Sequence, residues 1–138
     1  MNLPIDQKIN ELIQRAFENK PLILMASPGS GKTTRYPAAL LREYQKRQIL
    51  KKIIVLVPKR LAAVAAADRI AEENDWIFKK DVGYQVRFES AIEPSTQLIF
   101  MTEGFFLKKI QSVDFLNSIG HIVLDEFHER SANLDLIL

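Results

Sequence analysis

The sequence has no cysteine, only two histidines and no long apolar run among its 138 residues. Without cysteine there can be no disulfide and no thiolate metal site, and two histidines argue against a histidine-based zinc site. No stretch of about 18 apolar residues is present, so no membrane span is expected. The first residues lack the pattern of a secretory signal, and the absence of cysteine fits a reducing compartment. We therefore expect a cytoplasmic protein.

The composition fits one globular unit, because 47% hydrophobic residues in a chain of this length can form one core. A net charge of +2 is too small to indicate a nucleic-acid partner by itself. The sign of the charge nevertheless changes along the sequence. The basic residues gather in the middle at Lys46, Arg47, Lys51, Lys52, Lys59 and Arg60, and the acidic ones near the end at Asp125, Glu126 and Glu129. On charge alone, the basic run is most simply a solvated face.

Short apolar runs alternate with stretches of helical spacing. Strands are predicted at 21–25, 53–57, 82–88, 97–102 and 121–125, and helices at 6–20, 32–45, 60–74 and 103–111. A strand followed by a long helix occurs twice, which predicts an α/β fold with a mainly parallel sheet flanked by helices. The alternating pattern at 82–88 fits a strand at the edge of this sheet.

The segment Ala26–Thr33 matches a phosphate-binding loop, [AG]-x-x-x-x-G-K-[ST], between a predicted strand and a predicted helix. Gly29 and Gly31 allow backbone angles at which the loop N–H groups face an anion, assisted by the helix dipole. Lys32 would reach the β- and γ-phosphates, and the Thr33 hydroxyl would bind Mg²⁺. The alternative, without a binding role, is a glycine- and serine-containing turn beside a lysine.

An acidic pair follows the last predicted strand and completes this chemistry. Phosphate-loop ATPases need a carboxylate on the metal side, and the carboxyl ends of parallel strands meet at one edge of the sheet. Asp125 would hold Mg²⁺, directly or through water, and Glu126 is suited to orient the attacking water or to accept its proton. The alternative is an acidic pair in a surface turn.

The residues around this pair carry a resemblance to a known family. The segment 125–130, Asp-Glu-Phe-His-Glu-Arg, resembles motif II of the DEAH-box helicases, with Phe127 where alanine is usual. Four more segments resemble motifs of that family in the same order: 26–34 (motif I, in which the first Ala is tolerated), 57–63 (motif Ia), 82–89 (the Gly-Tyr-x-x-Arg strand) and 101–104 (motif Ib). From about residue 21 onward, the sequence is therefore similar to the first RecA-like domain of a DEAH-type superfamily 2 RNA helicase, and within that group to the bacterial HrpB type.

The resemblance implies a role for several residues. It implies nucleotide binding by Gly29, Ser30, Gly31, Lys32, Thr33 and Thr34, and places metal and water chemistry on Asp125 and Glu126. His128 would sense the γ-phosphate, with a solvent-facing turn histidine as the alternative. Arg60 and Thr102 would hold the nucleic-acid backbone without reading bases. Their alternatives are a surface residue at a helix start and a strand-end cap, while His121 and Arg87 receive no site role.

The same resemblance implies ATP and Mg²⁺ as cofactors, and single-stranded RNA and a second RecA-like domain as partners. Neither the expected Ser-Ala-Thr motif nor the arginine fingers of a second RecA-like domain occur in residues 1–138. We expect these residues to form one partial, N-terminal ATP-binding domain of a longer protein, with feeble hydrolysis on its own. A non-helicase phosphate-loop protein, either a small kinase or a regulatory ATP-binding module, is the alternative.

Overall fold

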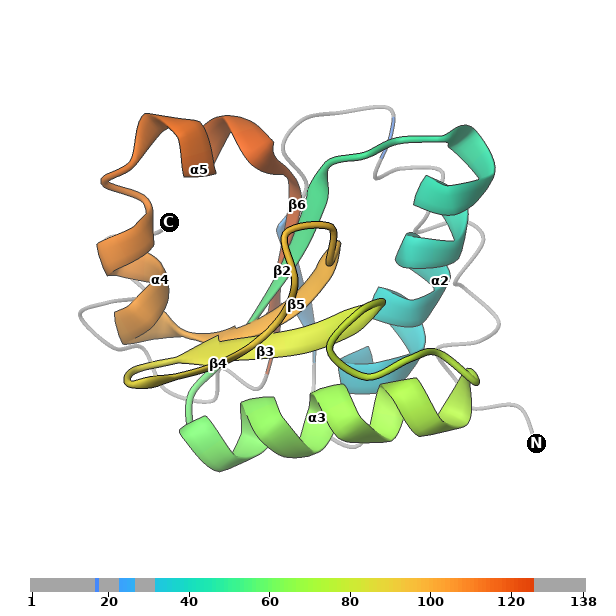
Figure 1. The fold of residues 1–138 in the computed structure, drawn as a ribbon, viewed down its shortest axis with the longest axis horizontal. Helices are drawn as coiled ribbons and strands as arrows, with labels where there is room; N and C mark the ends of the chain where they lie inside the picture. Colours follow the sequence, from blue (N-terminus) through green and yellow to red (C-terminus); the bar gives the residue numbers. More distant parts are fainter. Residues whose placement is uncertain (1–16, 18–22, 27–31, 126–138) are drawn as a thin grey trace.

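The computed structural model describes residue 17, residues 23–26 and residues 32–125, and these residues form a sheet covered by helices on both faces (Figure 1). The strands are β1 (Ile23–Ala26), β2 (Lys52–Val57), β3 (Val82–Val86), β4 (Glu89–Ala91), β5 (Leu98–Thr102) and β6 (Ile119–Asp125). The helices are α2 (Lys32–Arg47), α3 (Arg60–Glu73), α4 (Glu103–Lys109) and α5 (Val113–Ser118). Apart from Phe17, the helix predicted at 6–20 lies outside the described residues. None of the described helices is long and apolar enough to cross a membrane.

The strand order is β1-β6-β2-β5-β3-β4, and every pairing except β3 with β4 is parallel. This confirms the predicted α/β fold with a mainly parallel sheet. The edge position predicted for residues 82–88 is wrong, because β3 ends at Val86 and the antiparallel strand β4 covers its outer side. Arg87 and Phe88 form the turn between them, and Phe88 adopts a φ of 69°. A three-residue strand, Glu-Ser-Ala, carries too little apolar pattern to be seen in the sequence.

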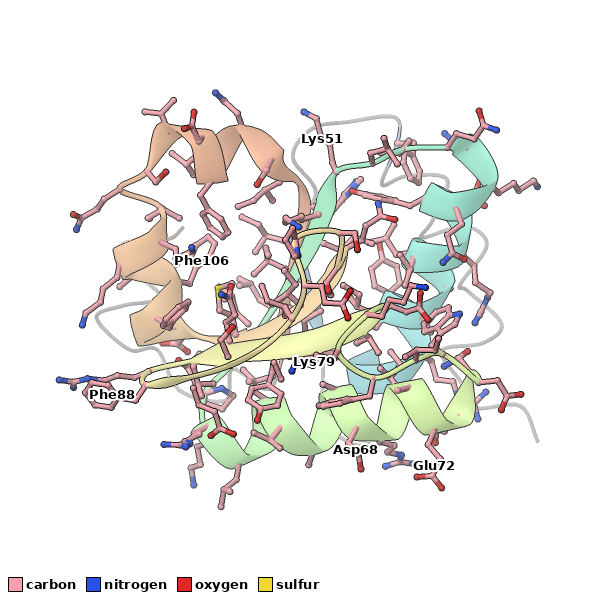
Figure 2. The ribbon with its side chains drawn as sticks, in the orientation of Figure 1. Lys51, Asp68, Glu72, Lys79, Phe88 and Phe106 are labelled. Atoms are coloured by element: carbon pink, nitrogen blue, oxygen red, sulfur yellow. The ribbon has the colours of Figure 1, made fainter. Side chains whose placement is uncertain are left out.

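The continuous apolar run of β2 is explained by burial on both faces of the sheet. Ile53, Val55 and Val57 face the core formed with α2 and α3. Ile54 and Leu56 face a second core, which includes Phe106 of α4. Strands of parallel sheets that are covered on both sides read as unbroken hydrophobic segments rather than as alternating ones. Figure 2 shows Phe106 between α4 and the sheet.

The first core contains a polar contact between α2 and β6. The buried Tyr44 hydroxyl is hydrogen-bonded to Nδ1 of His121, which is also buried. The ring of Phe17 meets the His121 ring edge-on at a centroid distance of 5.2 Å. Burial raises the pKa of Tyr44, with a smaller contribution from Tyr36, so the Tyr44 hydroxyl stays protonated at neutral pH. His121 thus lies in the core, away from the carboxyl ends of the strands.

We expect Gly83→Ala to destabilise the protein by about 1–3 kcal/mol, the usual cost of forcing extra atoms into a packed site. A Cβ at Gly83 would lie 1.9 Å from the backbone oxygen of Ala91 in β4, so the β3–β4 pairing would have to shift. Chemical denaturation followed by circular dichroism measures the change. Gly104→Ala is the matched control, because a Cβ there meets nothing within 4 Å and lies in the helix α4. Equal stability of the two variants would contradict this account of Gly83.

Candidate functional site

Five parallel strands, β1, β6, β2, β5 and β3, end at the same edge of the sheet, and their register fixes which ends are neighbours. Ala26, the last residue of β1, pairs with Asp125, the last residue of β6. Leu56 of β2 pairs with Leu124 of β6 on one side, and Val57 pairs with Thr102 of β5 on the other. Ligands of open α/β sheets bind at this carboxyl edge. The edge therefore gathers segments that lie far apart in the sequence.

β1, whose last residue begins the predicted phosphate loop, ends at this edge. β1 ends at Ala26 and α2 begins at Lys32, so the strand and the helix predicted to flank the loop are both present. Lys32, Thr33 and Thr34 form the start of α2, whose first turn contains no acidic residue. Free backbone N–H groups and the helix dipole favour an anion at such an end. The predicted nucleotide residues Gly29, Ser30 and Gly31 lie outside the described residues.

The predicted acidic partner, Asp125, lies beside the end of β1 at the level of the backbone. Asp125 ends β6, and its pairing with Ala26 places it next to the residue from which the loop starts. The sheet thus brings the two halves of the predicted ATP site to one edge, as parallel strands require. Glu126 and His128 come after β6 and lie outside the described residues. Among the residues that are described, no group of three His, Asp or Glu side chains could hold a metal ion by itself.

Arg60 lies at the same edge, at the start of α3. The preceding residue, Lys59, is extended, with φ −132° and ψ 147°, and provides no side-chain cap for the helix. Nη2 of Arg60 donates a hydrogen bond to Oε1 of Glu89, the first residue of β4. The other carboxylate oxygen of Glu89, Oε2, accepts a hydrogen bond from the Tyr84 hydroxyl. Arg60 is therefore at a helix start, as the alternative of a surface residue predicted, but it also belongs to a hydrogen-bonded network with Tyr84 and Glu89.

Sequence reasoning did not find Tyr84 and Glu89 as neighbours of Arg60. The two side chains meet because a two-residue turn at Arg87 and Phe88 folds β4 back along β3. A signal was present, since Tyr84 and Glu89 are five residues apart and flank that turn. The pKa of Glu89 is lowered, first by the hydrogen bond from Tyr84 and then by that from Arg60. The carboxylate is therefore ionised at neutral pH.

Thr102 ends β5 and stands at the N-cap position of α4. Its side chain is half-buried and makes no hydrogen bond to the α4 backbone, so the alternative of a capping threonine is not supported by a capping contact. Thr102 pairs with Val57, the last residue of β2. Arg60 follows Val57 by three residues. Of the two residues predicted to hold the nucleic-acid backbone, Thr102 thus ends β5, and Arg60 begins the helix that follows the adjacent strand β2. Arg87, to which no site was assigned, lies over the ring of Phe88 at 4.8 Å.

This arrangement defines the class of the protein. The sheet is mainly parallel and has helices on both faces. At its carboxyl edge, β1 is followed in the sequence by α2, and an acidic residue ends the neighbouring strand β6. These are the features of a RecA-like domain. The sequence profile of the family described as DEAD/DEAH box helicase matches residues 5–135. The chain belongs to this family.

Curated relatives agree with this assignment. The chain is 36% identical to ATP-dependent RNA helicase DHX30 of Gallus gallus, over 99% of this chain and 11% of the relative. It is 36% identical to ATP-dependent RNA helicase TDRD9 of Homo sapiens, over 99% of this chain and 10% of the relative. A probable ATP-dependent RNA helicase DHX35 homolog of Caenorhabditis elegans is also 36% identical, over 100% of this chain and 19% of the relative. The chain thus spans between a tenth and a fifth of these relatives. The narrower resemblance to the HrpB type stays a prediction.

Proposed function

We propose that this chain is the ATP-binding part of an ATP-dependent RNA helicase, in which ATP hydrolysis drives movement along a single RNA strand. The observation that carries the proposal is the common edge of the sheet. There Ala26, at the start of the predicted phosphate loop, Asp125 and Thr102 each end a strand, and Arg60 begins the helix that follows β2. A small kinase needs the first two features but has no need of the last two. Membership of the DEAD/DEAH box helicase family and the names of the relatives support the helicase over that alternative.

The residues at the edge fit Mg²⁺ and ATP. Lys32 would bind the β- and γ-phosphates, together with Gly29, Ser30, Gly31 and the hydroxyl of Thr34. The Thr33 hydroxyl and the Asp125 carboxylate are hard oxygen ligands of the kind that Mg²⁺ prefers. When bound, the ion would neutralise charge on the phosphates. The part of this set that the structure describes is consistent with the fit, since Lys32 and Thr33 begin a helix and Asp125 ends a strand at the same edge.

Two residues that follow β6 would carry the chemistry of hydrolysis. Glu126 would orient the attacking water and accept its proton. His128 would contact the γ-phosphate region and couple its state to a second RecA-like domain. Such a domain would supply the arginine fingers, which are worth roughly 10³ to 10⁵ in rate in phosphate-loop enzymes. We therefore propose weak hydrolysis by residues 1–138 alone and full activity only in the longer protein.

We expect the intact protein to bind a labelled oligouridylate with an affinity that falls steeply with salt, and RNA to stimulate its ATPase rate. For single strands, the slope of log K against log salt is about −0.7 per phosphate contact. Arg60→Ala should reduce the magnitude of that slope by about 0.7, because one phosphate contact is lost. Fluorescence anisotropy at several salt concentrations measures the slope. An ATPase rate that is indifferent to RNA, without oligouridylate binding, would favour the kinase or regulatory module instead.

A further inference from the structure

We propose that Tyr84 and Glu89 are positioning residues that hold the Arg60 guanidinium ready for an RNA phosphate. The inference rests on the proposed function, because it concerns the same predicted backbone contact. It goes further in assigning a task to two residues outside the first turn of α3. The contacts run from β3 to the carboxylate at the start of β4, and from there to α3.

The network begins at a side chain with little freedom to move. Tyr84 is only 6% exposed, and its ring packs in the core between the sheet and α3. Its backbone is held on both sides, by Phe100 of β5 and by Ala91 of β4. The ring of Phe78 lies 6.1 Å away, centroid to centroid. A rigid ring gives its hydroxyl a fixed position, and that hydroxyl therefore fixes the carboxylate oxygen to which it donates.

The carboxylate of Glu89, oriented by Tyr84, in turn orients the guanidinium of Arg60. Oε2 is held by Tyr84, so the orientation of the carboxylate is set, and Oε1 then accepts from Nη2 of Arg60. Figure 1 shows the turn between β3 and β4 beside the first turn of α3, which is why so short a link suffices. The side chain of Glu89 is 41% exposed, so an ordinary surface carboxylate here would be free to choose among several rotamers. The hydrogen bond from the Tyr84 hydroxyl restricts Glu89 to one of these rotamers.

Arg60 keeps capacity for a second ligand while it is held. A guanidinium carries five N–H donors, and the contact with Glu89 is made through Nη2 alone. The Arg60 side chain is 55% exposed, and it lies at the edge where Thr102 also ends its strand. An arginine that is ordered before it meets a phosphate loses less conformational freedom on binding. The arrangement therefore favours a shared arginine, with the carboxylate on one nitrogen and the phosphate on others.

A carboxylate near a phosphate also repels it, and the experiment must separate this charge effect from positioning. Two variants leave the charge unchanged. Tyr84→Phe removes the hydroxyl that holds Glu89 and keeps the ring. Glu89→Asp keeps the charge but draws the carboxylate back by one methylene, so that it no longer reaches Arg60 and Tyr84 together. Each is made in the intact protein with Arg60 present and in the Arg60→Ala background, and oligouridylate binding is measured by anisotropy at several salt concentrations.

Positioning predicts a loss of about two- to tenfold in oligouridylate affinity for each variant, and no further loss in the Arg60→Ala background, because coupled residues are not additive. The salt slope should also become shallower, by up to about 0.7. MgATP binding should not change. Glu72→Asp is the matched control, since Glu72 is exposed near the other end of α3 (Figure 2), and it should bind the oligouridylate like the parent.

Three results would overturn the inference. Unchanged or tighter binding by both charge-neutral variants would show that Glu89 competes with the phosphate or has no part in binding. An equal loss with and without Arg60 would show a general structural effect that does not pass through the arginine. Failure of the parent protein to bind oligouridylate at all would overturn the proposed function and the inference with it. Either of the first two results, obtained with a parent that binds oligouridylate, would overturn the inference alone.

Discussion

Lys32→Ala is expected to weaken MgATP binding by about 10- to 100-fold. Hydrogen bonds to charged groups are worth about 1.5–3 kcal/mol, and 1.4 kcal/mol corresponds to a factor of ten. Lys32 belongs to the predicted loop and begins α2, where the helix dipole and the free N–H groups already favour phosphate. The ammonium group of lysine adds a full positive charge that the backbone cannot replace. Titration with a fluorescent ATP analogue in the presence of Mg²⁺ measures the change.

The matched control for this prediction is Lys46→Ala. Lys46 is exposed in the last turn of the same helix, so its replacement changes the net charge equally but at the far end of α2. The control should bind MgATP like the parent. If Lys32→Ala also bound MgATP like the parent, the assignment of residues 26–33 as a phosphate loop would be wrong. Circular dichroism of both variants shows whether the fold is retained.

Glu126→Gln should lower ATP hydrolysis by about 10²- to 10⁴-fold while MgATP binding is retained. That range is typical for the loss of a general base, because glutamine keeps the shape of the side chain but cannot accept the proton of the attacking water. Asp125, which we propose as the metal ligand, is left intact. The measurement is single-turnover hydrolysis in the intact protein with RNA present, so that product release does not mask the chemical step.

Glu93→Gln serves as the control for this variant. Glu93 is exposed in the turn before β5, at the sheet edge opposite the carboxyl ends, and the same change of charge there should leave hydrolysis unaffected. A loss of MgATP binding in Glu126→Gln would assign the residue to nucleotide or metal binding. Hydrolysis at the parent rate would remove Glu126 from the chemistry and return the acidic pair to the reading of a surface turn.

The elements with a long, regular pattern were predicted well. β2 and β5 were found from their apolar runs, and α3 from its alanine-rich stretch, which the structure ends at Glu73 with Asn74 as the C-cap. Helix α5 was missed because six residues are too few for a test of periodicity. A local signal existed, since Ser112 caps this helix by accepting a hydrogen bond from the Phe115 N–H at 3.3 Å. Short elements are decided by capping and packing more than by pattern.

In the candidate site, too, features that depend on local sequence were predicted, and contacts between distant segments were not. The phosphate loop was predicted because a strand, a glycine-containing segment and a helix follow one another in the sequence, so that the prediction depends on local order in the chain. Arg60 and Thr102 were named only through the resemblance to a family. The structure adds that Thr102 ends β5 and that Arg60 begins the helix after the adjacent strand β2. The contact of Arg60 with Glu89 could not be predicted from periodicity. It depends on where β3 ends and on which residues form the turn.

By itself, then, the sequence determined the α/β class, the phosphate-loop pattern and the acidic strand end, since each is written in residues that are neighbours in the chain. Only the tertiary structure decided that β6 lies between β1 and β2, that Ala26 pairs with Asp125, and that β4 closes the edge. Strand order and register come from packing between segments that are far apart in the sequence, where side chains on both faces of the sheet must be buried together. The link from Tyr84 through Glu89 to Arg60 is a product of that packing.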